Sequence, residues 1–232
     1  MRKSSQRLFS KATYLLTVFC SLTATGPIAA QCPAVLNGQG STMLQPFVRA
    51  NEVNFQAVNS SFQVTYNTDL TLTGSDNGYL TLLGGFSKFG GLDYPIPCGL
   101  QTNLNGNRVL TYPIAVGGVA IGYKKQGLVA PLQLDADQLA KIFTGQLTLW
   151  SEIQPALTGP IKVIVRTNGS GDTFNFTSYL SQRAAPALWS YNAGSNFPNI
   201  PGFNPALAID NQDMANQLQN DGTIGYLAFG YT

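Results

Sequence analysis

Apolar and polar residues along the first part of the chain alternate between strand and helix patterns. A short apolar run at 34–36 predicts a strand, and the alternation at 62–66 predicts a second strand. Between them, apolar residues at helical spacing predict a helix that Ser41 or Thr42 caps and that ends near Phe55. The pattern therefore begins as strand, helix, strand.

The same order continues toward residue 93. Ser75 or Asp76 is placed to cap a helix that ends near Leu83, and residues 89–93 predict a third strand. Strands that alternate with helices in this way are typical of a parallel sheet, whose loops at the carboxyl ends of the strands carry ligand groups. The sequence therefore predicts an α/β fold.

A different pattern begins at residue 109. Residues 112–123 are almost wholly apolar around a glycine pair and predict one long strand. Because residues 101–108 are polar and rich in turn formers, we place a boundary there, between a lobe at 31–108 and a lobe at 109–232. The further predicted elements are a helix at 135–144 capped by Asp135, a strand at 161–165, a helix at 174–184, a loop at 191–205, a helix at 210–219 and a strand at 225–229.

The first thirty residues have the pattern of a signal peptide. A basic start is followed by an apolar run at 14–22, which is shorter than the ~20 residues of a spanning helix. Small residues then lead to Ala30, near which we expect cleavage. The chain is therefore expected to be periplasmic or secreted. The basic residues of this segment are Arg2, Lys3, Arg7 and Lys11.

Charge and composition exclude several functional classes. The chain has 13 Lys and Arg against 11 Asp and Glu; without the four basic residues of the leader nine remain, so the net charge becomes 9 − 11 = −2. No basic patch of the nucleic-acid-binding kind is left. The chain has no histidine, which excludes histidine-based catalysis and histidine metal sites. Cys32 and Cys98 could pair in an oxidising compartment, a question that the sequence leaves open.

Three strand-to-helix loops carry chemistry suited to an anion. They cover residues 38–43, 73–78 and 166–173, and each combines glycine, a hydroxyl group and a helix start. Backbone N–H groups at such a helix start favour a tetrahedral anion. Arg166 adds a positive charge at the end of a predicted strand.

These motifs resemble the periplasmic phosphate-binding proteins of the phosphate ABC transporter, a PstS-like branch of the type II periplasmic binding proteins. The resemblance implies two α/β lobes that close on inorganic phosphate, a monomer, and an inner-membrane ABC permease as partner. It also implies that the C-terminal part of the first lobe is missing here, and that the protein is not an enzyme and has no metal or cofactor. The matching motifs are Gly38-x-Gly-Ser-Thr, Phe89-Gly-Gly-Leu-Asp, Pro113-Ile-Ala-Val-Gly-Gly-Val, Ile142-Phe-Thr-Gly with Trp150, Arg166-Thr-Asn-Gly-Ser-Gly, Phe176-Thr-Ser-Tyr-Leu and Gly222-Thr-Ile-Gly-Tyr.

The resemblance also implies roles for individual residues. Two positions depart from the family pattern: Asp172 stands where many relatives have threonine, and Asn168 where many have aspartate. Asp172 could cap the helix, face away from the ligand and offer only its backbone N–H, in which case Thr173 would supply the hydroxyl group. If Asp172 instead faces the anion, the affinity is expected to suffer. The implied phosphate ligands are Thr42 and Met43 as hydroxyl and backbone donors, Ser75 or equally Thr73 as a hydroxyl donor, Ser170, Gly171 and Asp172 as loop donors, Arg166 as the ion-pairing arginine, and Asp93 as the acceptor of a hydrogen bond from the ligand.

Two other functions remain as alternatives. A secreted interaction protein, such as an adhesin or an inhibitor, could reuse the fold without transport. Hydrolysis of phosphate esters is disfavoured because the chain has no histidine to activate a nucleophile.

Overall fold

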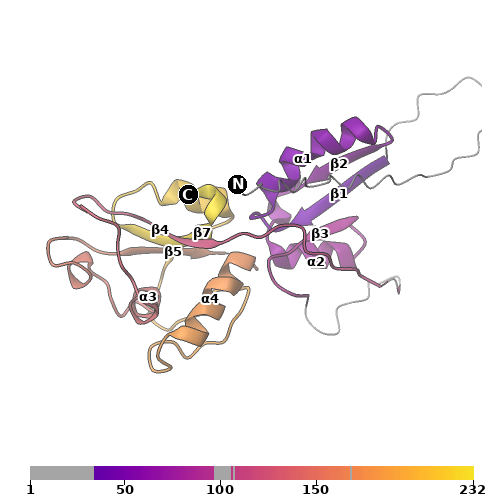
Figure 1. Cartoon of the computed structure of the whole chain (residues 1–232). Coiled ribbons are helices and arrows are strands. Elements are labelled where there is room, and N and C mark those ends of the chain that lie inside the picture. Colours follow the sequence, from indigo (N-terminus) through magenta and orange to yellow (C-terminus); the bar gives the residue numbers. More distant parts are fainter. Residues whose placement is uncertain (1–33, 97–105, 107, 168) are drawn as a thin grey trace, which may run out of the picture. The chain divides into compact units, whose positions relative to one another are not determined.

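The computed structural model describes residues 34–96, 106, 108–167 and 169–232, which pack as one compact unit (Figure 1). The expected leader, Cys32, Cys98 and Asn168 lie outside the described residues, so the leader and the cysteine pairing stay predictions. Among the described helices, none is long and apolar enough to cross a membrane.

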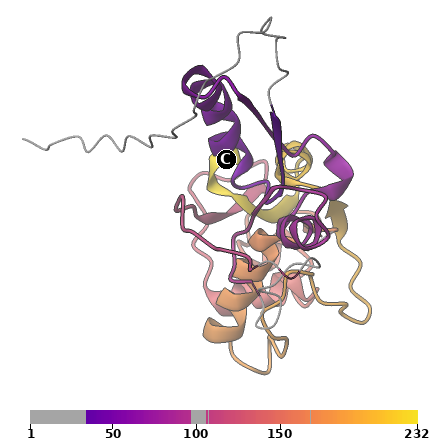
Figure 2. The same ribbon diagram turned by 90° about the vertical axis from the view of Figure 1, so that its right-hand side faces the viewer.

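A three-stranded parallel sheet, here the N-terminal sheet, forms from the first part of the chain. Its strand order is β2-β1-β3, so the chain crosses the sheet in opposite directions and places its two helices on opposite faces (Figure 2). This confirms the predicted α/β order. The elements are β1 (Ala34–Gly40), α1 (Gln45–Val58), β2 (Phe62–Tyr66), a 3₁₀ turn at Leu70–Leu72, α2 (Ser75–Leu83) and β3 (Phe89–Gly91).

The predicted caps of both helices are wrong. The N-cap of α1 is Leu44, which makes no capping side-chain hydrogen bond, and no residue of α1 is buried. The N-cap of α2 is Gly74, whose φ of 100° suits glycine, so Ser75 is already the first helical residue. Ser41 Oγ accepts a hydrogen bond from the Leu44 backbone nitrogen at 3.3 Å, but the hydroxyl groups of Ser41 and Ser75 both donate to Asp93, which is part of the site described below.

Small residues bring α2 against the carboxyl ends of β1 and β3. A Cβ atom on Gly40 would lie 2.2 Å from the carbonyl oxygen of Gly91, and one on Gly78 would lie 2.5 Å from that same oxygen. Asn67, itself at φ 50°, accepts a hydrogen bond from the Gly40 backbone nitrogen at 2.8 Å and donates one to the Gly40 carbonyl at 3.1 Å. The end of β1 is therefore fixed where Ser41 begins.

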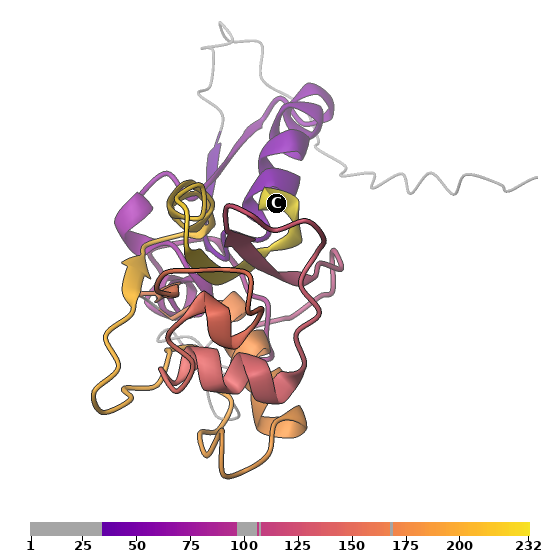
Figure 3. The same ribbon diagram turned by 90° about the vertical axis from the view of Figure 1, so that its left-hand side faces the viewer.

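The C-terminal sheet has four strands in the order β4-β7-β5-β6, with β4 antiparallel to β7 and the other pairs parallel. Helices α3 and α4 contact each other on one face, and α5 packs against the other (Figure 3). The elements are β4 (Val119–Lys124), α3 (Ala136–Phe143), a 3₁₀ turn at Trp150–Glu152, β5 (Lys162–Arg166), α4 (Gly171–Arg183), β6 (Ala206–Ala208), α5 (Asn211–Gln217), β7 (Thr223–Ala228) and a 3₁₀ turn at Phe229–Tyr231.

An aromatic cluster fills the core under α3 and α4. The ring of Phe176 stacks on Tyr226 and meets the edge of Phe143, each at a centroid distance of 4.6 Å. Trp150 and Trp189 are buried in the same half of the molecule. This core holds α4 against β7 and so sets where the start of α4 lies.

Several predicted elements have different bounds in the structure, and two of these differences bear on the site. The long strand expected at 112–123 is strand only from Val119, because the preceding segment is exposed and Val116 contacts no neighbours that would hide it. Helix α4 begins at Gly171 rather than at residue 174, since Ser170 is its N-cap. The short strand β6 was not predicted.

The start of α3 follows its prediction. Asp135 is the N-cap, accepting a hydrogen bond from the Gln138 backbone nitrogen at 2.8 Å, while the Gln138 side chain accepts from the Asp135 nitrogen at 3.0 Å. This reciprocal pair is a capping box, and it confirms the helix start read from the sequence.

Candidate functional site

Hydroxyl groups at the carboxyl end of the N-terminal sheet converge on Asp93. Ser41 follows β1 and donates to Asp93 Oδ2 at 2.5 Å, and Ser75 at the start of α2 donates to the same oxygen at 3.1 Å. The backbone nitrogen of Asp93 returns a hydrogen bond to Ser75 Oγ at 3.3 Å. Asp93 is thus held by two strand-to-helix loops.

The environment of Asp93 makes its carboxylate a good proton acceptor. Burial raises its pKa to about 6, because a partly buried site disfavours the charged form. The hydrogen bond from Ser41 opposes this rise, and the negative charge of Asp172 adds to it. At neutral pH and above, Asp93 is therefore mainly ionised and can accept a proton-bearing group.

Arg166 lies at the end of β5 and is 3% exposed. Its Nη1 atom is 2.9 Å from Asp172 Oδ2, and its Nη2 atom donates to the carbonyl oxygen of Ile209 at 3.2 Å. Asp172 belongs to the first turn of α4 and is 1% exposed. Of the two orientations considered for Asp172, the structure contradicts the capping one: Ser170 is the N-cap, and Asp172 forms a buried ion pair with the arginine.

Three donors meet on the carboxylate of Asp172. Besides Arg166, the side-chain nitrogen of Asn211 donates to Oδ2 at 2.8 Å, and Ser170 Oγ donates at 3.3 Å. Ser170 takes the capping role instead, since its Oγ accepts from the Asp172 backbone nitrogen at 3.1 Å. Burial raises the pKa of Asp172, and the charge of Arg166 opposes that rise.

Asn211 connects this cluster to the first loop of the chain. Its side-chain nitrogen also donates to Thr42 Oγ1 at 2.9 Å, and its Oδ1 accepts from the backbone nitrogen of Ala228 at 2.9 Å. Asn211 is fully buried at the start of α5. Thr42 and Asp172, which are far apart in sequence, are therefore bridged by one amide.

The start of α4 packs directly against Asp93. A Cβ atom on Gly171 would lie 2.4 Å from Asp93 Oδ2 and 2.7 Å from Ser75 Oγ. One turn further along α4, Asn175 donates to the Asp93 carbonyl oxygen at 3.0 Å. The start of α4, which also carries Asp172, therefore lies against Asp93 and Ser75 and brings the two clusters close together.

Replacing Gly171 with alanine is expected to lower the free energy of unfolding by about 1–3 kcal/mol, because the added methyl group overlaps Asp93 and Ser75. Urea unfolding followed by circular dichroism measures the effect. Gly118 is the matched control, since a Cβ atom there meets nothing within 4 Å and its variant should lose no stability. Equal stability of the two alanine variants would contradict the close packing.

The remaining residues that were predicted to bind phosphate differ in their contacts. Of the two hydroxyl alternatives, Ser75 contacts Asp93, whereas Thr73 donates to the carbonyl oxygen of Leu70 at 3.3 Å. Met43 lines an open, largely apolar groove whose wall also includes Asp93. The role of the Met43 backbone as a donor stays a prediction.

Sequence reasoning missed two residues of the cluster. Ser41 was assigned to a helix cap, although it lies next to Thr42 in the glycine motif and could have been found there. Asn211 follows an ordinary helix cap at Asp210, and only the tertiary structure reveals its contacts.

The assembled site combines one guanidinium, two carboxylates, several hydroxyl groups and an amide. Hydroxyl groups, an amide and an arginine are donors that an oxyanion requires, while a carboxylate such as Asp93 requires a proton from its partner. Among the described residues, no group of three acidic, cysteine or histidine side chains could hold a metal ion. The arrangement suits a small anion that carries its own protons.

Comparison with known proteins adds independent information. The model of the PBP superfamily domain matches residues 25–232. The phosphate-binding protein PstS of Xylella fastidiosa is 26% identical over 220 residues, covering 90% of this chain and 57% of that protein. The phosphate-binding protein PstS 2 of Mycobacterium tuberculosis is 33% identical over 175 residues, covering 69% of this chain and 46% of that protein. The chain thus spans about half the length of these curated relatives.

A solved structure shows the same fold. The phosphate-binding protein from Stenotrophomonas maltophilia superposes with a TM-score of 0.65 at 20% sequence identity, covering 84% of this chain and 60% of that one. The mixed α/β architecture with two sheets is therefore that of the two-lobed binding proteins.

Proposed function

This chain belongs to the PBP superfamily, and from that premise we propose that it is an exported solute-binding protein that captures inorganic phosphate for ABC-type import. The curated relatives named above are phosphate-binding proteins. The proposal is for binding without catalysis, which agrees with a chain that has no histidine.

The observation that carries the proposal is that the start of α4 brings the buried Arg166–Asp172 pair close to the partly buried Asp93. Arg166 favours an anion, while the hydroxyl group of Ser75 contacts Asp93 and that of Ser170 contacts Asp172, the ionic partner of Arg166. Asp93 disfavours an anion without a proton, because like charges repel and its lone pairs would face no donor. Phosphate at neutral pH carries both a negative charge and a proton, whereas sulfate carries only the charge.

The remaining parts of the proposal concern the setting of the protein. We propose a periplasmic or secreted monomer that delivers phosphate to an inner-membrane ABC permease and binds no nucleic acid. The basic, then apolar, start of the sequence and the net charge of −2 without it support this setting. The two lobes at 31–108 and 109–232 would enclose the ligand.

Isothermal titration of the protein without residues 1–30 tests the proposed function. Phosphate is expected to bind with measurable heat at pH 7, and sulfate at the same concentration is expected to give none. Absence of phosphate binding, or equal binding of both anions, would reject the proposal.

Replacing Asp93 with asparagine is expected to let sulfate bind, because an amide can donate a hydrogen bond where the carboxylate could only accept one. A buried acceptor left unpaired costs about 1–3 kcal/mol, and more when it is charged, so the phosphate-to-sulfate affinity ratio should fall at least about tenfold. Titration with both anions measures the ratio. Asp69→Asn, at an exposed capping residue, is the control and should keep the native ratio. Unchanged selectivity in the Asp93 variant would remove this residue from anion discrimination.

A further inference from the structure

The positive charge in the site is already compensated from within the protein. Asp172 Oδ2 lies 2.9 Å from Arg166 Nη1 and also accepts hydrogen bonds from Asn211 and Ser170. Arginine, amide and hydroxyl groups are the donors that would otherwise face an oxygen of a bound anion. The carboxylate of Asp172 therefore competes with the ligand for these donors.

The second carboxylate oxygen of Asp172 is a buried hydrogen-bond acceptor that lacks a donor among the described residues. Asp172 Oδ1 is buried, and no hydrogen-bond partner for it is found in the described part of the chain. Buried carboxylate oxygens normally accept a hydrogen bond, since leaving one unpaired is unfavourable. A ligand that donates a proton at this point would satisfy it, whereas a bare anionic oxygen would be repelled.

The net charge of the ionised side chains in the site also favours a ligand that carries protons. With both carboxylates ionised, Arg166, Asp172 and Asp93 sum to +1 − 1 − 1 = −1. A dianion would add two further negative charges to a buried site, where charges interact strongly. The monoanion of phosphate adds only one and has two protons, one for each carboxylate.

Resting on the proposed function, we propose that Asp172 is a specificity-determining residue that makes the site take phosphate as the doubly protonated monoanion rather than as the dianion. Relative to the dianion, each bound phosphate then brings one additional proton into the complex. The pH dependence is the same whether that proton stays on phosphate or moves to a carboxylate. A neutral side chain at position 172 would free Arg166 for the dianion.

The titratable groups around Asp172 allow a clean test above pH 7. The pKa of Asp93 is about 6, so this residue stays ionised there. Burial raises the pKa of Tyr226 to about 12 and also raises that of Tyr231, so both stay neutral. The charged and titratable groups that face Asp172 are Arg166 on β5, Asp93 after β3, Tyr226 on β7 and Tyr231 in the last 3₁₀ turn, while α5 contributes the neutral Asn211. With these neighbours constant, the change between pH 7 and 9 reports on phosphate and on Asp172, whose pKa burial also raises.

Isothermal titration with total phosphate at pH 7, 8 and 9 tests the proposal. For the native protein, Kd should rise toward about tenfold per pH unit, because one proton is bound with each ligand. For Asp172→Asn and Asp172→Thr, Kd should stay nearly constant over this range and lie at least about tenfold below the native value at pH 9. Asp221→Asn, which removes the carboxylate of an exposed ion pair with Lys125, should keep the native slope.

The outcomes distinguish this proposal from the proposed function. A native Kd that is constant from pH 7 to 9 overturns the role of Asp172 while leaving phosphate binding intact, and this result does not depend on any variant folding. Folded Asp172 variants that keep the native slope also overturn it. Absence of phosphate binding by every protein at every pH rejects the proposed function, and with it the inference.

Discussion

Replacing Arg166 with alanine is expected to abolish measurable phosphate binding and to lower the free energy of unfolding by about 3–5 kcal/mol. The loss of binding follows from removing the positive charge of the cluster. The loss of stability follows because Asp172 would remain as a buried carboxylate without its ionic partner. Titration calorimetry and urea unfolding followed by circular dichroism measure the two effects.

A double variant separates the two consequences of this change. Arg166→Ala combined with Asp172→Ala should recover part of the lost stability, because removing both partners of a buried pair is less unfavourable than removing one. It should not recover phosphate binding. Arg183→Ala, at the exposed end of α4, is the control and should bind and unfold like the native protein. Retained phosphate affinity in Arg166→Ala would contradict the assignment of the site.

Phe176→Ala is expected to destabilise the protein by about 3–5 kcal/mol, the usual range for truncating a buried aromatic side chain. The ring of Phe176 is 4% exposed and contacts both Phe143 and Tyr226. Urea unfolding followed by circular dichroism measures the loss.

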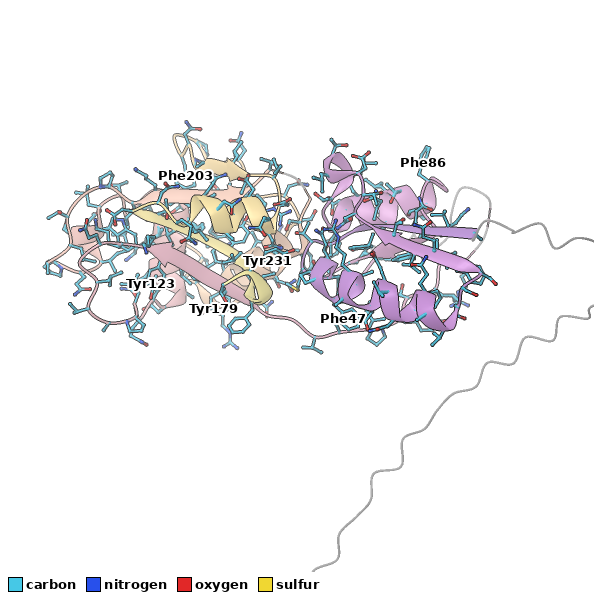
Figure 4. All side chains as sticks on the ribbon, turned by 90° about the horizontal axis from the view of Figure 1, so that it is seen from above. Phe47, Phe86, Tyr123, Tyr179, Phe203 and Tyr231 are labelled. Atoms are coloured by element: carbon cyan, nitrogen blue, oxygen red, sulfur yellow. The ribbon has the colours of Figure 1, made fainter. Side chains whose placement is uncertain are left out.

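An exposed phenylalanine provides the matched control for this variant. Phe86 is 78% exposed (Figure 4), so Phe86→Ala should change the free energy of unfolding by no more than about 0.5 kcal/mol. The Phe176 variant should also weaken phosphate binding, because Tyr226 donates to or accepts from Thr173 at 2.9 Å and accepts from the Arg166 backbone nitrogen at 3.3 Å. Equal stability of the two variants would contradict the placement of the core.

The order of helices and strands could be predicted from the sequence because their apolar periods differ. The strand at 62–66 and the helix cap at Asp135 were predicted correctly, since each has a clear local signal. Helix starts at Ser41 and Ser75 were misread because a hydroxyl before an apolar run resembles a cap. Both hydroxyl groups donate to Asp93, which is far away in sequence, although Ser41 Oγ also accepts a hydrogen bond from the Leu44 backbone nitrogen at 3.3 Å.

The sequence motifs of the candidate site could be predicted, but the hydrogen bonds and the ion pair between its side chains could not. Arg166 and Asp93 stand in recognisable motifs, and the start of α4 lies between them, with Gly171 against Asp93 and Asp172 paired with Arg166. The orientation of the Asp172 side chain could not be predicted from the sequence, because Ser170 is an equally good N-cap and takes that role. Asn211 acts only through contacts made on folding, so nothing in its local sequence marks it.

Both tryptophans of the chain, Trp150 and Trp189, are buried in the half built on the C-terminal sheet. Intrinsic indole fluorescence therefore reports on that half, and melting of the N-terminal sheet by itself would leave the emission spectrum nearly unchanged. An optical probe attached near β1 or β2 would make the other half visible. With the two signals recorded together, one unfolding step or two could be told apart.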